Sequence, residues 1–484
     1  MAIMANLRSS LAIAAGKGSA WLTRRIGRGG TALPGLVAST LDPHLIGKLT
    51  RSLPRGAAVV TGTNGKTTTT RMISTILQHA EWRVLHNRSG SNLIRGLAAT
   101  LVQAASVGGK LPADFALFEV DEAAVPAAML EVQPRLLLFN NLFRDQLDRY
   151  GEVENVRRKW VDALKQVPVG TTVLLNADDP GIASLGLGLD SATVLYFGLD
   201  DEEGAHNMGA LQHQADSLEC PVCRTHLAYE AVYTAHVGRY HCPNCGFKRP
   251  TPHFRARRVL LHGTQGSTVL LSTPDGEGEL AVLVPGLYNV YNALAATAAS
   301  ITLGLTLAQV QAGLAEFKAA FGRIERIAIG DKSLLMALVK NPVGFNEVMR
   351  MLLASEDRLH LLILINDLFA DGRDVSWLWD VDFELLTKAH ELAAVTTGGI
   401  RAEEMALRLK YAGVDPALIS IVAGDAPTGR GKTHLYDTAL DKALASTPTG
   451  TTLYVLPTYT AMLGLREVLA ERGLVKQFWE DLCS

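Results

Sequence analysis

The chain has 484 residues, of which 48% are hydrophobic and 19% charged, so it is long enough for two or three domains with well-developed cores. Its 46 basic and 48 acidic residues leave a formal net charge of −2, which gives no general attraction for nucleic acid, and we expect no nucleic-acid partner. No apolar run approaches the roughly 18 residues that a membrane-spanning helix needs, so the sequence predicts a cytoplasmic protein.

Residues 1–55 are rich in alanine and are predicted to form a short helical segment, broken by the glycines of 27–30 and by Pro34. The segment is basic and amphipathic, a pattern typical of helices that lie on a membrane surface. Its apolar stretch is short and is interrupted by Gly-Lys-Gly at 16–18, unlike a secretory signal peptide. We therefore expect a peripheral contact with the inner face of the membrane.

From residue 57 to about 198, short apolar runs alternate with helical stretches, a rhythm that predicts βαβ units and a mostly parallel sheet. A polar stretch with two cysteine pairs interrupts the pattern; β-like runs around Val259 and Ser267 and then a long helix follow. A second alternating region begins near Ile327. The strands predicted in the two regions are 57–60, 116–120, 135–140, 171–177, 334–339, 359–366, 393–398 and 452–458.

The first predicted strand runs directly into TGTNGKTTTT at 61–70. In such a loop the glycines let backbone N–H groups approach phosphate oxygens, Lys66 supplies a positive charge near the β- and γ-phosphates, and the Thr67 hydroxyl can ligate Mg²⁺. The following helix points its positive end at the same anion. The usual first glycine of the pattern is replaced by Val60, so this is a variant loop. The predicted phosphate-binding residues are Gly62, Thr63, Asn64, Gly65, Lys66, Thr67 and Thr68.

Carboxylates follow the next strong strand pattern, where Glu119 is succeeded by Val-Asp-Glu at 120–122. A carboxylate at the C-terminal end of a parallel strand beside a phosphate loop can hold or orient hydrated magnesium. We assign Glu119 this metal or catalytic role, with a solvated turn acid as the alternative. Another predicted strand ends in Asn140-Asn141.

Two cysteine pairs, Cys220/Cys223 and Cys242/Cys245, are separated by 18 residues. Each C-P-x-C turn can direct two thiolates at one ion, and four thiolates complete a closed tetrahedral zinc site. A closed site has no open position for water, so we predict a structural zinc. The fifth cysteine, Cys483, stands alone at the tail.

Together these segments resemble the Mur ligase family of ATP-dependent amide-forming enzymes, from about residue 56 to the end. The resemblance rests on the 61–68 loop, on Glu119, on G-x-x-N-x-x-N at 286–292 and on an arginine matched by Arg323. It implies an α/β fold of three parts, which are a helical segment of 1–55, a P-loop ATPase-like central domain of 56–325 with a zinc ribbon inserted at about 203–255, and a Rossmann-like C-terminal domain of 326–484.

Carried over residue by residue, the resemblance implies ATP and Mg²⁺ as cofactors. Lys66 and Thr67 match the phosphate and magnesium contacts, and Glu119 matches a second magnesium ligand. Asn289 and Asn292 match the adenine-side residues, although helix capping is an equal alternative for this pair. Arg323 matches an interdomain contact to phosphate.

Several positions depart from the family pattern. Gln146 replaces a histidine, which weakens one expected metal contact. Lys159 is the best match to a lysine that many Mur ligases carbamylate, but its spacing is one residue short, and a solvated helix lysine is the alternative. The family's D-x-A-H-x-P is replaced by A-L-V-K-N-P at 337–342. About 55 residues precede the loop, too few for the UDP-gripping domain of Mur ligases, so we expect the substrate to be held differently.

The segment 366–380 holds four aspartates and two tryptophans, which is unusual for a mere turn and indicates a site or an interface. With 338–347 and the cysteine ribbon, it resembles the MurT family of ligase subunits. That family amidates the D-glutamate α-carboxyl of the lipid II stem peptide to D-isoglutamine through an acyl phosphate, with ammonia from a GatD-type glutaminase subunit. A MurT aspartate completes the glutaminase Cys-His pair, and we place it at Asp374, with Asp380 as second choice.

The cysteine residues of the chain indicate that a separate subunit supplies the glutaminase activity. A glutaminase needs an activated cysteine nucleophile, whereas four cysteines are assigned to zinc and Cys483 lies at the tail without a nucleophile turn. We therefore expect a heterodimer. The alternatives are a stand-alone Mur or folylpolyglutamate-type amino-acid ligase and a non-catalytic, nucleotide-binding zinc-ribbon scaffold.

Overall fold

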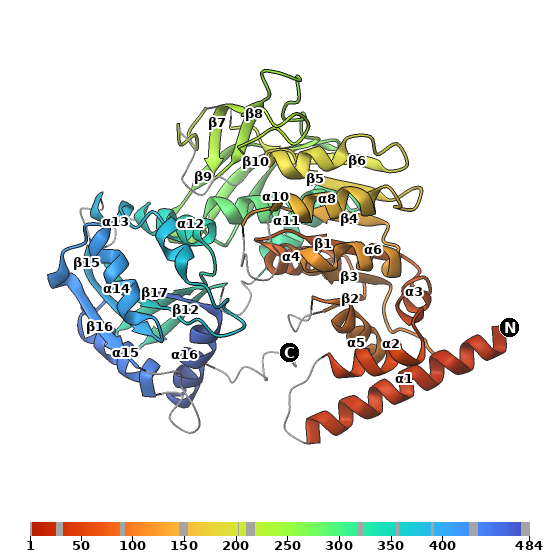
Figure 1. The fold of residues 1–484 in the computed structure, drawn as a ribbon, viewed down its shortest axis with the longest axis horizontal. Helices are drawn as coiled ribbons and strands as arrows, with labels where there is room; N and C mark the ends of the chain where they lie inside the picture. The colour runs from red at the N-terminus through yellow and green to blue at the C-terminus, as the bar shows by residue number, and fades with distance from the viewer. Residues whose placement is uncertain are drawn as a thin grey trace.

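The computed structural model describes residues 2–25, 32–87, 92–144, 153–201, 203–209, 218–317, 323–354, 358–388, 392–424 and 434–475. These residues form a nine-stranded sheet, a six-stranded sheet and a separate two-stranded hairpin, with helices on both faces of the large sheets (Figure 1). No helix in the described part of the chain is long and apolar enough to cross a membrane.

The nine-stranded sheet has the order β11-β10-β9-β6-β5-β4-β1-β3-β2. Its strands from β2 to β9 pair in parallel, and β10 and β11 extend it in antiparallel fashion. The strands are β1 (Ala57–Thr61), β2 (Val84–His86), β3 (Phe115–Glu119), β4 (Leu136–Phe139), β5 (Thr172–Asn176), β6 (Thr193–Leu199), β9 (Phe254–Leu261), β10 (Ser267–Thr273) and β11 (Gly276–Val282).

Strand β1 shows why the sheet is covered on both sides. Its residues are all buried, and side chains alternate, so that Ala58 and Val60 enter one core while Ala57 and Val59 enter the other. The first core is closed by α4 (Lys66–His79), α10 (Leu287–Thr302) and α11 (Leu307–Ala315). The second is closed by α1 (Ala2–Arg25), α2 (Leu33–Leu41), α3 (Leu45–Thr50), α5 (Ile94–Ala104), α6 (Val125–Val132) and α8 (Val153–Leu164).

The six-stranded sheet has the order β12-β13-β17-β14-β15-β16, and only the β12–β13 pair is antiparallel. Its strands are β12 (Arg323–Ile329), β13 (Lys332–Ala337), β14 (Leu359–Leu364), β15 (Leu392–Gly399), β16 (Ile419–Ala423) and β17 (Thr452–Pro457). One face is covered by α12 (Pro342–Leu353), α13 (Leu385–Lys388) and α14 (Ala402–Tyr411), and the other by α15 (His434–Ala445) and α16 (Tyr459–Glu471).

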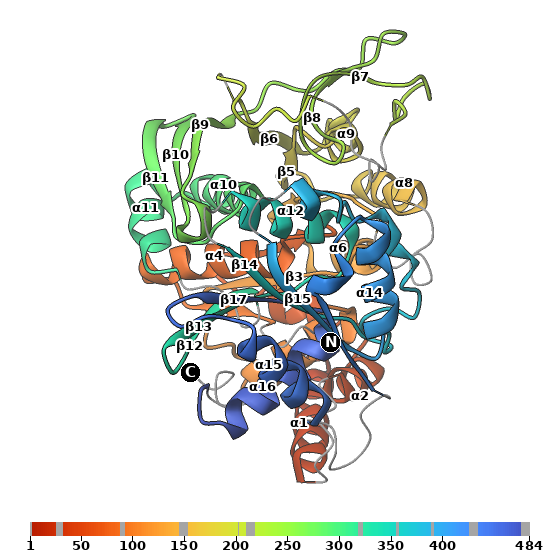
Figure 2. The same cartoon turned by 90° about the vertical axis from the view of Figure 1, so that its left-hand side faces the viewer.

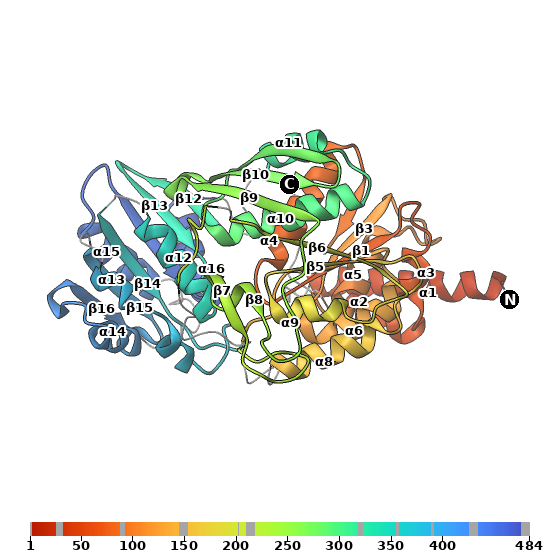
Figure 3. The same ribbon diagram turned by 90° about the horizontal axis from the view of Figure 1, so that it is seen from above.

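The eight strands predicted from apolar runs are present as β1, β3, β4, β5, β13, β14, β15 and β17, which confirms the α/β fold class. The long helix is α10, and the runs near Val259 and Ser267 are β9 and β10. The hairpin of β7 (Ala228–Thr234) and β8 (Val237–His241) stands at the upper end of the molecule (Figure 2). Seen from above, it lies beside α12 of the second sheet (Figure 3).

Candidate active site

The loop after β1 has the backbone of a phosphate-binding turn. Gly65 has a φ of +82°, and a Cβ placed there would lie 2.0 Å from Oδ1 of Asn292, so the position requires glycine. Helix α4 begins at the next residue, and no side chain caps its N-terminus. The first N–H groups of α4 are therefore left for an anion, at the positive end of the helix dipole.

Lys66 is 8% exposed and lies under this loop. Its Nζ donates to the carbonyl oxygens of Gly62 at 2.5 Å and Thr63 at 3.3 Å and lies 2.9 Å from Oε2 of Glu122. Burial alone would lower the pKa of Lys66, but the neighbouring carboxylates, Glu122 foremost, hold that pKa above its usual range. The lysine therefore stays charged where phosphate oxygens would arrive.

Thr67 and Glu119 meet on the other side of the same turn. The hydroxyl of Thr67 donates to Oε1 of Glu119 at 2.9 Å. The backbone of Glu119 is fixed by the buried amide of Asn87, which donates to its carbonyl at 2.8 Å and accepts from its N–H at 2.9 Å. A hydroxyl and a carboxylate held together are the hard oxygen donors that Mg²⁺ takes, so these two residues fit the predicted metal role.

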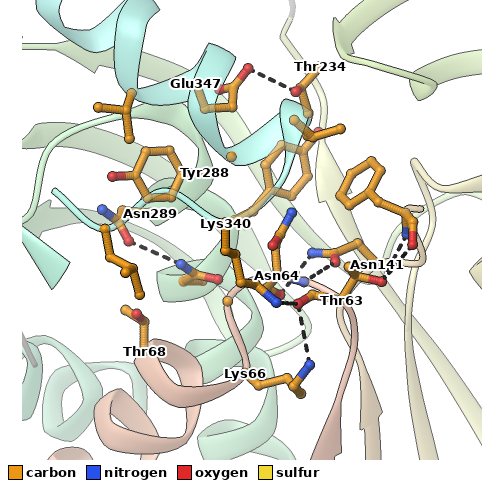
Figure 4. Close-up of a pocket in the computed structure, with 18 of the residues that line it drawn as sticks. Thr63, Asn64, Lys66, Thr68, Asn141, Thr234, Tyr288, Asn289, Lys340 and Glu347 are labelled. Atoms are coloured by element: carbon orange, nitrogen blue, oxygen red, sulfur yellow. Dashed lines mark hydrogen bonds between the residues drawn. The ribbon is translucent and has the colours of Figure 1, made fainter. Parts of the chain in front are cut away.

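A cavity lies between this loop and the six-stranded half of the chain, and its lining includes Asn64, Lys66, Tyr288, Lys340 and Glu347 (Figure 4). Lys340 donates through Nζ to the carbonyl of Thr63 at 3.2 Å. The side-chain amides of Asn64 and Asn341 pair, with Nδ2 of Asn341 at 3.0 Å from Oδ1 of Asn64. Lys66, in the loop after β1, and Lys340, in the segment after β13, therefore both lie at the predicted phosphate-binding loop.

Asn289 and Asn292 both line the cavity and are buried on α10. Nδ2 of Asn289 donates to the carbonyl of Pro285 at 2.7 Å, and Nδ2 of Asn292 donates to Oδ1 of Asn289 at 3.0 Å. Oδ1 of Asn292 accepts from the hydroxyl of Thr69 at 3.2 Å. The pair thus ties the start of α10 to α4 at the cavity wall, and its adenine-side role stays a prediction.

The four cysteines of the ribbon converge. The Sγ atoms of Cys220 and Cys245 lie 3.5 Å apart, as do those of Cys223 and Cys242, and all four lie within 4.8 Å of one another. Sulfur atoms bound tetrahedrally at about 2.3 Å from one zinc would be about 3.8 Å apart, so this donor set fits a closed zinc site.

The tip of the ribbon hairpin forms part of the cavity wall, which the sequence did not indicate. Thr234 and Val237 both line the cavity, and the hydroxyl of Thr234 donates to Oε1 of Glu347 on α12 at 2.8 Å. Phe143 and Val343 pack against Val237 in a small apolar cluster. The hairpin therefore bridges the two large sheets at the site.

The four aspartates of the 366–380 segment have different environments, and none lines the cavity within the described residues. Asp367 binds Arg401 at 2.6 Å, the buried Asp371 accepts from the N–H of Thr460 at 2.8 Å, and Asp380 lies 3.7 Å from Arg144. Asp374 is exposed and accepts a hydrogen bond from the N–H of Ser376 at 2.8 Å. That bond lowers the pKa of Asp374 and keeps its carboxylate ionised.

Exposed aromatic side chains lie within this segment and against it. Phe369 is 73% exposed, Trp379 53% and Tyr411 70%. The rings of Trp379 and Tyr411 meet edge to face with centroids 5.6 Å apart. Clustered exposed aromatics are typical of a surface that another protein covers.

Of the other residues that the sequence singled out, only the side chain of Lys159 is described. Lys159 is exposed on α8 and does not line the cavity. Arg323 is the first residue of β12, and its side chain lies outside the described residues, as do Gln146 and Cys483.

Sequence reasoning did not assign site roles to Lys340, Asn341, Glu122 and Thr234. The only signal at 340–342 was a departure from the family pattern. Asn-Pro is also a common helix start, and Asn341 does cap the N-terminus of α12.

Solved structures share the fold. A pseudomurein peptide ligase type C from Methanothermus fervidus matches with a TM-score of 0.67 at 22% identity, over 89% of this chain and 81% of that one. The family model of the Mur ligase middle domain matches residues 60–247. The fold and the loop site together define an ATP-dependent ligase of the Mur type.

Two relatives narrow the class. Lipid II isoglutaminyl synthase (glutamine-hydrolyzing) subunit MurT of Streptococcus pneumoniae is 35% identical over 98% of this chain and 99% of that protein. The subunit of the same name from Staphylococcus aureus is 32% identical over 82% of this chain and 86% of that protein. The family model of the MurT ligase C-terminal region matches residues 338–462. The chain belongs to the MurT family, which confirms the resemblance.

The Lys66–Glu122 pair should make the free energy of unfolding fall as the pH is lowered. Burial alone would raise the pKa of Glu122, but the charges of Lys66 and Lys340 bring it down to about 2 in the folded protein, from 4.5. The ionised carboxylate thus stabilises the fold above pH 4.5, and this contribution is lost as pH falls toward 2. Glu122→Gln should lower the stability at pH 7 by about 3–5 kcal/mol, because it leaves a buried charge unpaired.

The measurement is the midpoint of unfolding in urea from pH 7 to pH 3. The deficit of Glu122→Gln relative to the unsubstituted protein should shrink as pH falls. Glu403→Gln, at an exposed position of α14, is the matched control and should show no deficit. A deficit of Glu122→Gln that stays constant over the whole range would contradict the assignment.

Proposed function

We propose that this chain is the synthetase subunit of a glutamine-dependent amidotransferase that converts the D-glutamate α-carboxyl of the lipid II stem peptide to D-isoglutamine. The observation that carries the proposal is the full-length similarity to subunits named lipid II isoglutaminyl synthase, in a chain whose phosphate loop is closed by Lys340 and Asn341. We keep the division into 1–55, 56–325 and 326–484, in line with the separate sheets.

ATP would be held at the 62–68 loop, with its phosphates against the N-terminus of α4 and between Lys66 and Lys340. Thr67 and Glu119 would hold Mg²⁺, which supplies charge neutralisation on the phosphate oxygens when it is bound. Asn289 and Asn292 would border the adenine side. Arg323, the first residue of β12, stays the predicted interdomain contact to phosphate.

The reaction would pass through an acyl phosphate. A substrate carboxylate oxygen attacks the γ-phosphorus, the bond from that phosphorus to the ADP oxygen breaks, and ADP leaves. Ammonia then attacks the acyl carbon, the carbon–oxygen bond to phosphate breaks, and nitrogen loses a proton. Lys66 and Lys340 stabilise the migrating negative charge, and their fixed positions make this electrostatic help effective.

The acyl phosphate must be kept from water. The contacts of Lys340 and Asn341 with the loop, and of Thr234 with Glu347, close the cavity between the two sheets. We propose that this closed arrangement is the one in which ammonia is admitted and water excluded.

Ammonia would come from a GatD-type glutaminase subunit that docks on the surface around Asp374. Asp380 faces the guanidinium of Arg144 and Asp367 that of Arg401, and Asp371 is buried against Thr460. The carboxylate of Asp374 instead accepts from the backbone N–H of Ser376, two residues along the chain, and is exposed and ionised. This difference supports Asp374 over Asp380 as the carboxylate that orients the partner's catalytic histidine.

The function is tested by reconstitution with lipid II, ATP, Mg²⁺ and glutamine. With glutamine as the nitrogen source, D-isoglutamine should form only when the glutaminase subunit is added. With ammonium chloride in place of glutamine, it should form without that subunit. Lys66→Ala should reduce the rate at least about 100-fold, since it removes a charge that acts on the transition state. The matched control Lys442→Ala, on the exposed face of α15, should keep full activity.

Other results would favour the alternatives. Consumption of ATP with a free amino acid and no partner would identify a stand-alone ligase. Unchanged function of Lys66→Ala would identify a scaffold. Equal use of glutamine by the purified chain alone would exclude the two-subunit proposal.

Asp374→Asn should abolish glutamine hydrolysis by the complex while leaving amidation with ammonium chloride and ATP binding unchanged. The reason is that the exchange removes only the charge that the partner's histidine needs. Asp380→Asn is the matched control and should retain glutaminase activity. If Asp380→Asn loses that activity and Asp374→Asn keeps it, the assignment between the two residues is wrong.

The zinc site should be structural. The purified chain should contain one zinc ion, Cys220→Ser should lose it, and the midpoint of thermal unfolding should fall because the ribbon hairpin loses its staple. Since the hairpin tip lines the cavity, the affinity for ATP should fall as well. Cys483→Ser is the control and should keep zinc and affinity. Full zinc content in Cys220→Ser would contradict the site.

A further inference from the structure

Helix α1 is apolar on its outward face. Leu7 (59%), Leu11 (62%), Trp21 (56%) and Leu22 (52%) are exposed and recur at helical spacing. The opposite face is also apolar, since Ala12, Ile13 and Ala20 are buried. A surface helix of a soluble protein normally has polar side chains on its outward face. The exposed apolar side chains of α1 therefore need a covering.

Helix α2, which packs against α1, also has exposed leucines. Leu33, Leu36 and Leu41 are 41%, 37% and 44% exposed. The two helices pack against each other, with Nε of Arg8 donating to the carbonyl of Leu41 at 2.7 Å. They form the lower right edge of the molecule, where α1 projects beyond the sheet (Figure 1). We call the seven exposed side chains the N-terminal apolar face; they are Leu7, Leu11, Trp21, Leu22, Leu33, Leu36 and Leu41.

The charges of the first 41 residues have one sign. Residues 1–41 contain five basic residues and no acidic one, and Asp42 is the first carboxylate of the chain. The Arg25 guanidinium stacks over the ring of Trp21 at 4.2 Å, and Nζ of Lys17 donates to the carbonyl of Gln103 at 3.1 Å. Apolar side chains bordered by cations, with a tryptophan at the boundary, suit the interface of an anionic bilayer.

We propose that the N-terminal apolar face is a membrane-docking surface, on which α1 and α2 lie flat against an anionic lipid bilayer. The proposal rests on the proposed function, because lipid II is anchored in the membrane and its peptide is presented at the bilayer surface. A second copy of the chain is a poorer occupant, since a two-fold contact would bring two basic patches together. The helices lie in the interface and do not cross it.

The test is flotation of the full-length chain with vesicles that contain no lipid II. The protein should float with vesicles of phosphatidylglycerol and phosphatidylcholine, float at least about 10-fold less with phosphatidylcholine alone, and be released by salt. Leu11→Glu combined with Trp21→Glu should lower the affinity for anionic vesicles at least about 10-fold. Leu187→Glu combined with Leu283→Glu, at positions 56% and 54% exposed elsewhere, is the matched control.

A second pair, Leu7→Glu with Leu22→Glu, guards against a local folding defect and should behave like the first. The same variants should amidate a water-soluble acceptor peptide at the unsubstituted rate and lose rate only on lipid II in vesicles. Failure of the unsubstituted chain to float, or flotation of both charged pairs equal to that of the unsubstituted chain, would overturn the proposal. A dimer that the charged pairs dissociate, without flotation, would instead assign the face to a second copy.

This result is separable from the proposed function. The vesicles hold no substrate, so flotation reports docking alone. Flotation without any amidation would contradict the proposed function but would still support the docking surface.

Discussion

The site depends on a charged lysine kept in a buried position. Removing an ammonium group from water costs free energy. For Lys66 this cost is offset because Oε2 of Glu122 lies 2.9 Å from Nζ and two loop carbonyls accept hydrogen bonds from it. The same contacts hold the turn of 62–65 in place before any anion arrives. A phosphate group then finds its cation already oriented, and little rearrangement is needed at the moment of reaction.

The surroundings of this lysine come from three parts of the chain. The central sheet supplies the loop, the second sheet supplies Lys340 and Asn341, and the ribbon hairpin supplies Thr234. Each makes a polar contact across the cavity, so the enclosure is a property of the assembled molecule. The cysteine cluster thus lies at one end of a hairpin whose other end lines the cavity.

The sequence predicted the strands and the local geometry of two motifs, while the roles of those motifs stay predictions. The 61–68 loop, the cysteine pairs and the strands of long apolar runs can be recognised within a few residues, because backbone geometry and burial dictate their residue types. Sequence reasoning failed for Lys340, whose contact with Thr63 spans 277 positions. It also failed for β2, three residues long and only half buried, where no continuous apolar run is required.

The proposals about partner and membrane draw on the same physical rule, that exposed apolar groups need a covering. Trp379 is exposed in the same 366–380 segment as the ionised Asp374, and Tyr411 meets its ring, whereas Trp21 and the leucines of α1 are exposed in a segment whose charges are all positive. A segment with an ionised aspartate and exposed aromatics suits a protein surface that offers a histidine, and leucines in a basic segment suit anionic lipid. The two faces therefore differ in the chemistry of what would cover them, and one chain could hold an acceptor at the bilayer while its other half receives ammonia.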